Sequence, residues 1–139
     1  MEITITAGNP PRRVTAPLSK SEGHRAMILA ALAEGETLLP VLPASDDVTA
    51  TKECLRQMGA GITETAQGLQ ISPIRAPAAN TVRLNCGESG STLRFLLPVA
   101  AALGRHAVFT GAGRLPERPV AELLEAMQKN GITAEVRRE

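Results

Sequence analysis

Three short polar stretches each combine a basic side chain with glycine or hydroxyl residues. The first is Lys20-Ser21-x-x-x-Arg25, which leads into the apolar run AMILAALA. A helix that begins here would present free backbone N–H groups and the positive end of its dipole. Lys20 adds a point charge, Ser21 adds a hydroxyl group, and Arg25 lies about one turn further on. This combination favours a phosphate or carboxylate ligand, and the alternative is a simple helix cap at Ser19 or Ser21.

The second stretch is Cys86–Arg94, with the sequence CGESGSTLR. Its two glycines would let a ligand approach the backbone. The hydroxyl groups of Ser89, Ser91 and Thr92 can donate hydrogen bonds to ligand oxygens. It is not a Walker loop, because no Gly-Lys-Ser/Thr follows the glycines. The alternative is again a helix cap combined with a turn.

The third stretch is Gly111–Pro119, GAGRLPERP, which places Arg114 and Arg118 on a glycine-rich loop. Two arginines on such a loop suit a carboxylate or phosphate, and the alternative is a solvated loop. Pro119 favours the first turn of a helix, so an outer helix is predicted to begin there. The two histidines are isolated in the sequence, and neither is expected to bind a metal ion.

The chain repeats itself once. SKSEGHRAMILAALAEG, from Ser19, resembles ESGSTLRFLLPVAAALG, from Glu88, with an offset of 69 residues that also relates ECLRQM to ELLEAM. Gly-Ile-Thr occurs at Gly61 and again at Gly131 after one inserted residue. The stretches ETLLPVL, from Glu36, and RHAVFTG, from Arg105, keep the same offset of 69 residues. Four matches in the same order indicate a duplicated unit of about 70 residues. Equivalent helix starts of the two units should therefore lie close together.

The elements that must position these stretches are predicted from hydrophobic periodicity. Helices at about 21–33 and 90–103 are apolar on all sides and are expected to be buried, whereas the second helix of each unit is amphipathic. Strands are predicted at 62–65, 69–74, 81–84 and 107–110, with further strand after Gly131. The predicted fold class is mixed α/β (α+β), with buried helices covered by sheets.

Composition narrows the classes of function. The 139 residues suffice for one compact domain, and a net charge of +1 gives no general attraction to nucleic acid or to an acidic membrane. Two Phe, with no Trp or Tyr, disfavour single-stranded nucleic-acid binding, which relies on base stacking. The stretch MEITIT lacks the basic start and apolar run of a signal peptide, and no apolar run in the sequence approaches the length of a membrane helix. Cys54 and Cys86 show no metal spacing. We expect a cytoplasmic protein that binds neither nucleic acid nor membrane.

The stretches PLSKSEGHRAMILAALA, LNCGESGSTLRFLLPVAAALG and TGAGRLPERPVAELLEAM resemble three signature stretches of the EPSP synthase family, in that family's order and spacing. The resemblance covers about the first third of the usual family length. It implies a partial inside-out α/β domain of the enolpyruvyl transferase type, built from repeated βαβαββ units. Residues 1–18 would form a segment that normally joins the other domain, residues 19–80 the first unit, and residues 81–139 a truncated second unit.

The resemblance also implies a reaction. The family transfers the enolpyruvyl group of phosphoenolpyruvate to the 5-hydroxyl of shikimate 3-phosphate, giving 5-enolpyruvylshikimate 3-phosphate and phosphate on the route to chorismate and aromatic amino acids. It uses no metal and no organic cofactor. The family's acid/base carboxylates, its substrate-binding glutamine and its distal lysine and arginines would lie beyond Glu139. We therefore expect this chain alone to be inactive, because its partner, the C-terminal portion of the same enzyme, is missing. We expect the chain to self-associate and the full enzyme to be monomeric.

Seven residues match family positions at the substrates: Lys20, Ser21, Arg25, Gly90, Ser91, Arg94 and Arg114. Lys20 resembles the lysine that contacts phosphoenolpyruvate and the active centre, and it is the catalytic candidate. Ser21 and Arg25 resemble the pair on shikimate 3-phosphate, and Gly90 and Ser91 resemble residues that line the phosphoenolpyruvate site. Arg94 matches the following arginine, and Arg114 matches the arginine on the phosphate or carboxylate of phosphoenolpyruvate.

The match has departures, and other functions remain open. Glu88-Ser89-Gly90-Ser91 stands where many members have Asn-Ala-Gly-Thr, and Phe95 stands where a proline is common. The related UDP-N-acetylglucosamine enolpyruvyl transferase has Lys-Asn in place of Lys20-Ser21 and a cysteine in the loop that here carries Arg114. RNA 3′-terminal phosphate cyclase, another relative in fold, would need a nucleotide site that the sequence does not show. A non-catalytic phosphate-binding module is the alternative from a different class.

Overall fold

The computed structural model describes residues 2–8, 13, 16, 18–40, 42, 44–75 and 81–137, and the fold is given for these residues. Their helices and strands follow in chain order: α1 (Lys20–Leu32), β1 (Thr37–Leu39), α2 (Asp46–Gln57), β2 (Gly61–Thr65), β3 (Gly68–Ser72), β4 (Val82–Asn85), α3 (Gly90–Ala102), β5 (Ala107–Thr110), the 3-10 helix η1 (Leu115–Glu117) and α4 (Ala121–Lys129).

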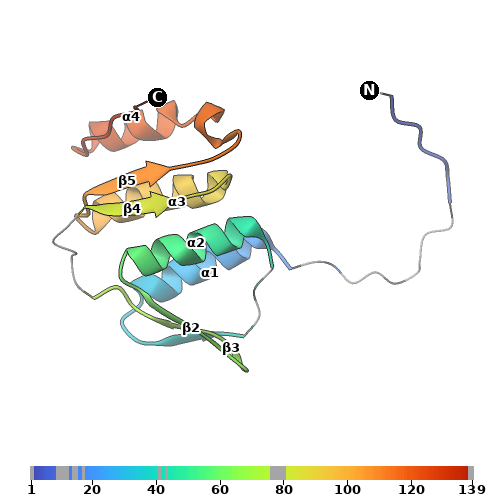
Figure 1. Ribbon diagram of the computed structural model, residues 1–139, viewed down its shortest axis with the longest axis horizontal. Coiled ribbons are helices and arrows are strands. Elements are labelled where there is room, and N and C mark those ends of the chain that lie inside the picture. The colour runs from blue at the N-terminus through green and yellow to red at the C-terminus, as the bar shows by residue number, and fades with distance from the viewer. Residues whose placement is uncertain are drawn as a thin grey trace.

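The elements stack in layers (Figure 1). An antiparallel sheet in the order β1-β3-β2 forms one outer layer, and α1 and α2 lie side by side on it. On the other side of these two helices lie α3 and the parallel pair β4-β5, with α4 beyond them. The largest fully buried apolar side chains fill the space between the layers: Met27, Leu55, Met58, Ile71, Leu84 and Leu96. The prediction of a mixed α/β fold with helices covered by sheets is confirmed.

A serine begins each of the three central helices. Ser19, Ser45 and Ser89 have extended backbone, and each side chain accepts a hydrogen bond from the N–H three residues later. A serine oxygen in this position satisfies one of the donors that a helix leaves free at its start. The sequence therefore fixes where α1, α2 and α3 begin.

Helix α2 of the first unit is continuous, whereas the equivalent stretch of the second unit is divided into η1 and α4. By the 69-residue offset, η1 corresponds to the first turn of α2, and Arg114 takes the place of the cap Ser45. Pro116 falls in the first turn, where a helix leaves its N–H groups unbonded, but Pro119 would remove the N–H of an intrahelical hydrogen bond, so one continuous helix cannot form. The prediction that the outer helix begins at Pro119 is wrong by two residues, because α4 begins at Ala121.

Two further predictions are corrected. Helix α1 is not buried on all sides, because the face that carries Glu22, Arg25, Leu29 and Leu32 is exposed, with Leu29 at 69%. Helix α3 likewise buries Leu96 and Ala100 and leaves Pro98 exposed. No strand forms over residues 132–137, where one was expected. In the first unit the equivalent β2 is held by β3, and no neighbouring strand takes that role among the described residues after Gly131.

The division into units at residue 80 remains a prediction, because residues 76–80 lie outside the described part of the chain, as do several positions before residue 18. Both halves do show the order helix, strand, helix. None of the described helices is long and apolar enough to span a membrane.

Candidate functional site

The second and third polar stretches meet at the carboxyl edge of the parallel pair. Asn85 at the end of β4 is the register partner of Thr110 at the end of β5. The loops that follow are joined by a hydrogen bond of 2.8 Å from the N–H of Ala112 to the carbonyl oxygen of Gly87. The carboxyl ends of parallel strands are where open α/β sheets commonly bind ligands. The topology thus brings both loops to one candidate site.

The start of α1 joins them through Asp47 in the first turn of α2. The Nζ atom of Lys20 lies 2.8 Å from Oδ2 of Asp47. The hydroxyl of Thr92, in the first turn of α3, donates to the carbonyl oxygen of Asp47 at 3.2 Å. The first turns of α1, α2 and α3 are therefore linked side by side, and the prediction that equivalent helix starts lie close together is confirmed.

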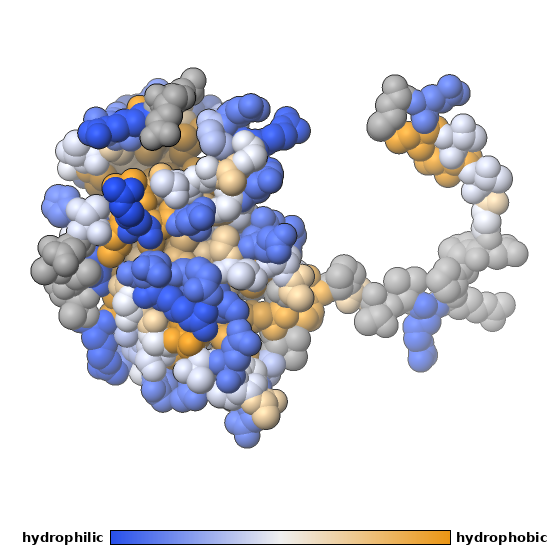
Figure 2. Space-filling view, viewed as in Figure 1, coloured by the Kyte–Doolittle hydropathy of each residue, from blue (hydrophilic) through white to orange (hydrophobic). Residues whose placement is uncertain are grey.

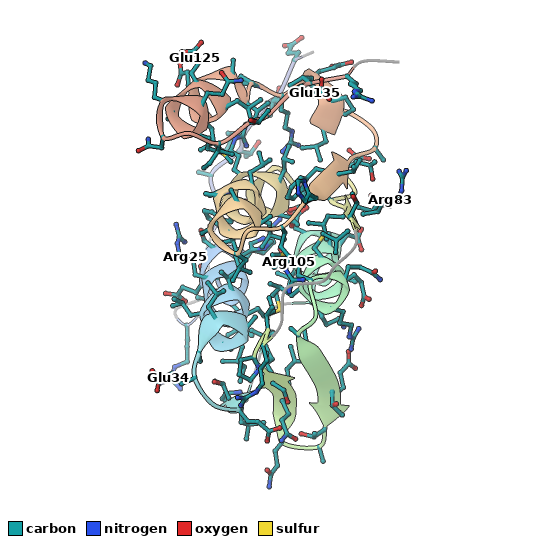
Figure 3. All side chains as sticks on the ribbon, turned by 90° about the vertical axis from the view of Figure 1, so that its left-hand side faces the viewer. Arg25, Glu34, Arg83, Arg105, Glu125 and Glu135 are labelled. Atoms are coloured by element: carbon teal, nitrogen blue, oxygen red, sulfur yellow. The ribbon has the colours of Figure 1, made fainter. Side chains whose placement is uncertain are left out.

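Arg25 lies where α1 meets α3 (Figure 3). Its guanidinium carbon is 5.1 Å from the centre of the Phe95 ring, an attractive cation–π arrangement. Its Nη1 atom donates to the hydroxyl of Ser21 at 2.7 Å and to the carbonyl oxygen of Ser21 at 3.1 Å. The structure thus brings Ser21 and Arg25 together, and Ser21 directly follows Lys20 in the chain.

Two guanidinium groups meet over Gly90. The Nη1 atoms of Arg94 and Arg118 lie 2.8 and 2.9 Å from the position that a Cβ atom on Gly90 would take, so they are less than about 6 Å apart. Nη2 of Arg94 also donates to the carbonyl oxygen of Pro119 at 2.9 Å. Neither arginine forms a salt bridge within the described part of the chain. Two like charges held this close favour an anion between them.

Arg118 was not among the predicted substrate-binding residues. The sequence places Arg118 on the same loop as Arg114, and the family resemblance selected Arg114. The structure brings Arg118 to Gly90, whereas Arg114 is exposed and its side chain makes no hydrogen bond with the described residues. Ser91 is likewise exposed, on the first turn of α3.

Two of the three hydroxyl groups expected to face a ligand are turned inward. Ser89 and Thr92 are 2% and 0% exposed, and their hydroxyl oxygens lie 2.7 Å apart. Ser89 caps α3 by accepting a hydrogen bond from the N–H of Thr92. The expectation that they donate to a ligand is therefore corrected, because both hydroxyl groups bond within the core.

His24, judged isolated from the sequence, belongs to the same buried group. Its Nδ1 atom is 2.7 Å from the hydroxyl of Thr51, which is 2.7 Å from the hydroxyl of Thr92. Burial lowers the pKa of His24, and the nearby cations Lys20 and Arg25 lower it further while Asp47 opposes them. No sequence signal linked these residues, because each lies on a different helix.

The two cysteines lie next to the site as buried free thiols. The Cys54 thiol donates to the carbonyl oxygen of Asn85 at 3.4 Å. A hydrogen bond with Cys54, together with burial, raises the pKa of the Cys86 thiol. Within the described ranges no three His, Cys, Asp or Glu side chains gather as a metal site would require.

A surface hollow at the far sheet is less suited to an anion. It is lined by residues of β1 and of the turn between β2 and β3: Glu36, Thr37, Leu38, Thr65, Gln67 and Gln70. Its single charged lining residue is an acid, and Figure 1 shows the β2–β3 turn at the opposite side of the molecule from β4 and β5. The basic cluster at the helix starts is the better candidate.

Comparison with known proteins gives one family. A family model described as EPSP synthase (3-phosphoshikimate 1-carboxyvinyltransferase) matches residues 10–139. A curated 3-phosphoshikimate 1-carboxyvinyltransferase from Clostridium beijerinckii is 38% identical over 137 residues, which are 94% of this chain and 32% of that protein. Another, from Clostridium kluyveri, is 41% identical over 118 residues, which are 85% of this chain and 28% of the relative.

Structural similarity agrees with this result. A solved EPSP synthase from Acinetobacter baumannii superposes with a TM-score of 0.76 at 28% identity, covering 91% of this chain and 29% of that one. The chain spans roughly a third of the length of the curated relatives it matches. Because the family model extends over nearly the whole sequence, this chain belongs to the EPSP synthase family.

Proposed function

We propose that this chain supplies part of the active site of an enzyme that transfers the enolpyruvyl group of phosphoenolpyruvate to the 5-hydroxyl of shikimate 3-phosphate. The observation that carries the proposal is a group of cations around the neighbouring starts of α1 and α3. Lys20 and Arg25 lie on α1, Arg94 lies on α3, and Arg118, from the loop before α4, meets Arg94 at Gly90. Both substrates carry phosphate, and phosphoenolpyruvate also carries a carboxylate. Cations beside helix N-termini suit such groups.

The arrangement suggests a role for each side of the site. Ser21 and Arg25 would hold shikimate 3-phosphate, and Gly90, Ser91 and Arg94 would line the place of phosphoenolpyruvate. Lys20, tied to Asp47, stands at the start of α1 within the same cluster and would stabilise charge that develops during transfer. Arg114, exposed on the loop that follows β5, would bind the phosphate or carboxylate of phosphoenolpyruvate.

The reaction needs more than anion binding. A C–O bond forms between the 5-hydroxyl oxygen and the enol carbon as the hydroxyl group loses its proton and the methylene carbon gains one. The bond from that carbon to the phosphate oxygen then breaks as the new methyl group loses a proton, which restores the double bond and releases phosphate. The groups expected to move these protons match family positions beyond Glu139. We therefore propose that this chain alone holds anions without turning them over, and that it works with the remainder of a longer enzyme in the cytoplasm.

A chimera tests the proposal. This chain would replace the matching third of the Clostridium beijerinckii relative, and phosphate release would be measured with both substrates. We expect turnover by the chimera and a loss of about 100-fold or more in kcat/KM for the Lys20→Met chimera, the scale for losing one stabilising group. A folded chimera without turnover would support the alternative of a non-catalytic phosphate-binding module.

A further inference from the structure

A row of hydrogen-bonded polar side chains crosses the core beneath the three helix starts. His24 on α1, Thr51 on α2, Thr92 on α3 and the α3 cap Ser89 follow one another with three contacts of 2.7 Å. All four are at most 2% exposed. Buried polar groups are costly unless they are paired, and a fully paired network fixes one arrangement of the elements that carry it. We refer to these four residues as the buried polar row.

A second branch leads from the row to Lys20. The hydroxyl of Thr92 reaches the carbonyl oxygen of Asp47, and the carboxylate of the same Asp47 holds Lys20. Thr92 therefore lies two contacts from Lys20, and in the chain it directly follows the buried Gly90 and the exposed Ser91 in the first turn of α3. The position of Lys20 relative to Gly90 depends on a path of contacts that passes through Thr92.

Counting protons assigns a direction to the row. The Thr92 hydroxyl has one proton and two acceptors in reach, the carbonyl oxygen of Asp47 and the hydroxyl of Ser89, so it accepts from Thr51. Thr51, having given its proton, accepts from Nδ1–H of His24. The neutral imidazole implied by the lowered pKa of His24 can supply that proton as the Nδ1–H tautomer. Within the buried polar row, Thr51 is the residue that connects His24 on α1 with Thr92 on α3.

We propose that Thr51 is a positioning residue for the anion site: its hydroxyl group sets the first turns of α1 and α3 in their relative position. Thr51 is fully buried and cannot itself contact a ligand. Its action is through His24 on one side and Thr92 on the other. Only the identity of the ligand rests on the proposed function, and the positioning role does not.

Three variants of the whole chain test this role. Thr51→Val keeps the shape and removes the hydroxyl group, Thr51→Ser restores a hydroxyl group, and Thr49→Val makes the same change at an exposed position of α2. Ile71→Val, in the buried centre of β3, is a control for lost stability alone. Backbone amide NMR spectra of each variant are compared, followed by titration with inorganic phosphate.

We expect Thr51→Val to move the amide signals of residues 21–24 and 89–92 and to weaken phosphate binding threefold or more. Thr51→Ser should return both readouts toward the wild type, and Thr49→Val and Ile71→Val should leave them unchanged. Signals that move only on α2, or a phosphate affinity that falls equally with Ile71→Val, would overturn the proposal. If the wild-type chain binds no phosphate, the anion site fails, and the amide signals alone decide the role of Thr51.

Discussion

At the scale of single residues, Gly90 makes room for the basic side chains of the candidate site. Its missing side chain lets the guanidinium groups of Arg94 and Arg118 approach the first turn of α3. The atoms that a Cβ would meet are the ends of two flexible side chains, not backbone. A methyl group here would therefore move the two charges and leave the fold intact.

We predict that Gly90→Ala weakens phosphate binding without loss of stability. The free energy of unfolding should stay the same or rise by up to about 1 kcal/mol, because alanine favours helix over glycine. Gly35→Ala, where no atom lies within 4 Å of the new Cβ, is the matched control. Phosphate titration and thermal unfolding of both variants are the measurements, and equal phosphate affinities would contradict the role given to Gly90.

The sequence predicted which residues gather at the site better than it predicted which way their side chains point. Lys20, Arg25, Gly90 and Arg94 gather as expected, because the repeat places them at equivalent helix starts. Whether a hydroxyl at a helix start faces a ligand or the core depends on the neighbouring helix, which spacing within one segment does not reveal. Thr92 turns inward because Thr51 and Asp47 on α2 offer it partners.

At the scale of elements, serine caps hold the three starts in place, but they differ in burial. Ser89 is 2% exposed and also contacts Thr92, whereas Ser19 is exposed and accepts one longer hydrogen bond of 3.3 Å from the N–H of Glu22. A cap that is exposed can be replaced in part by water. A buried cap has no such substitute.

We predict that Ser89→Ala lowers the free energy of unfolding by about 2 kcal/mol and Ser19→Ala by about 0.5 kcal/mol, the upper and lower ends of the range for serine caps. The loss at Ser89 includes a contact of the buried polar row. Denaturant unfolding of the two variants gives the comparison. A cost for Ser19→Ala equal to that for Ser89→Ala would show that burial of the cap does not matter.

Most elements could be predicted from the sequence because their signals are local. The bounds of α1, α3 and β5 agree with the apolar runs to within a residue. There are two exceptions: Pro119 interrupts the outer helix, and residues 132–137 form no strand without a neighbouring strand. The exposed face of α1 escaped prediction because an apolar sequence does not reveal what covers it.

At the scale of the whole molecule, stability should depend on the protonation of His24. Its pKa is lowered below the ordinary value of 6.5, so the folded chain binds fewer protons than the unfolded chain just below that pH. The free energy of unfolding should therefore fall as the pH drops below about 6.5 and should not depend on His24 above it. His24→Asn should flatten this slope, whereas the same change at the exposed His106 should keep it. A slope that survives His24→Asn would contradict the assignment.

The exposed face of α1 predicts self-association of this chain. Leu29 and Leu32 are 69% and 43% exposed on one side of the helix, and Figure 2 shows apolar side chains at the surface among charged ones. Burying such groups between copies is favourable. We expect sedimentation analysis to show larger species at higher concentration and to show fewer for Leu29→Gln/Leu32→Gln. A monomer at all concentrations would contradict this prediction.

Titration with shikimate 3-phosphate, followed by backbone amide NMR, tests the central claim most directly. The claim is that the helix starts of this chain form a partial site for an anionic substrate. We predict signal changes confined to residues 20–25, 88–94 and 112–118, with a dissociation constant of about 1 mM, or roughly −4 kcal/mol, because only part of the site is present. Arg25→Gln should weaken the binding. No change at concentrations up to about 10 mM, or changes centred on the hollow between Glu36 and Gln70, would contradict the claim.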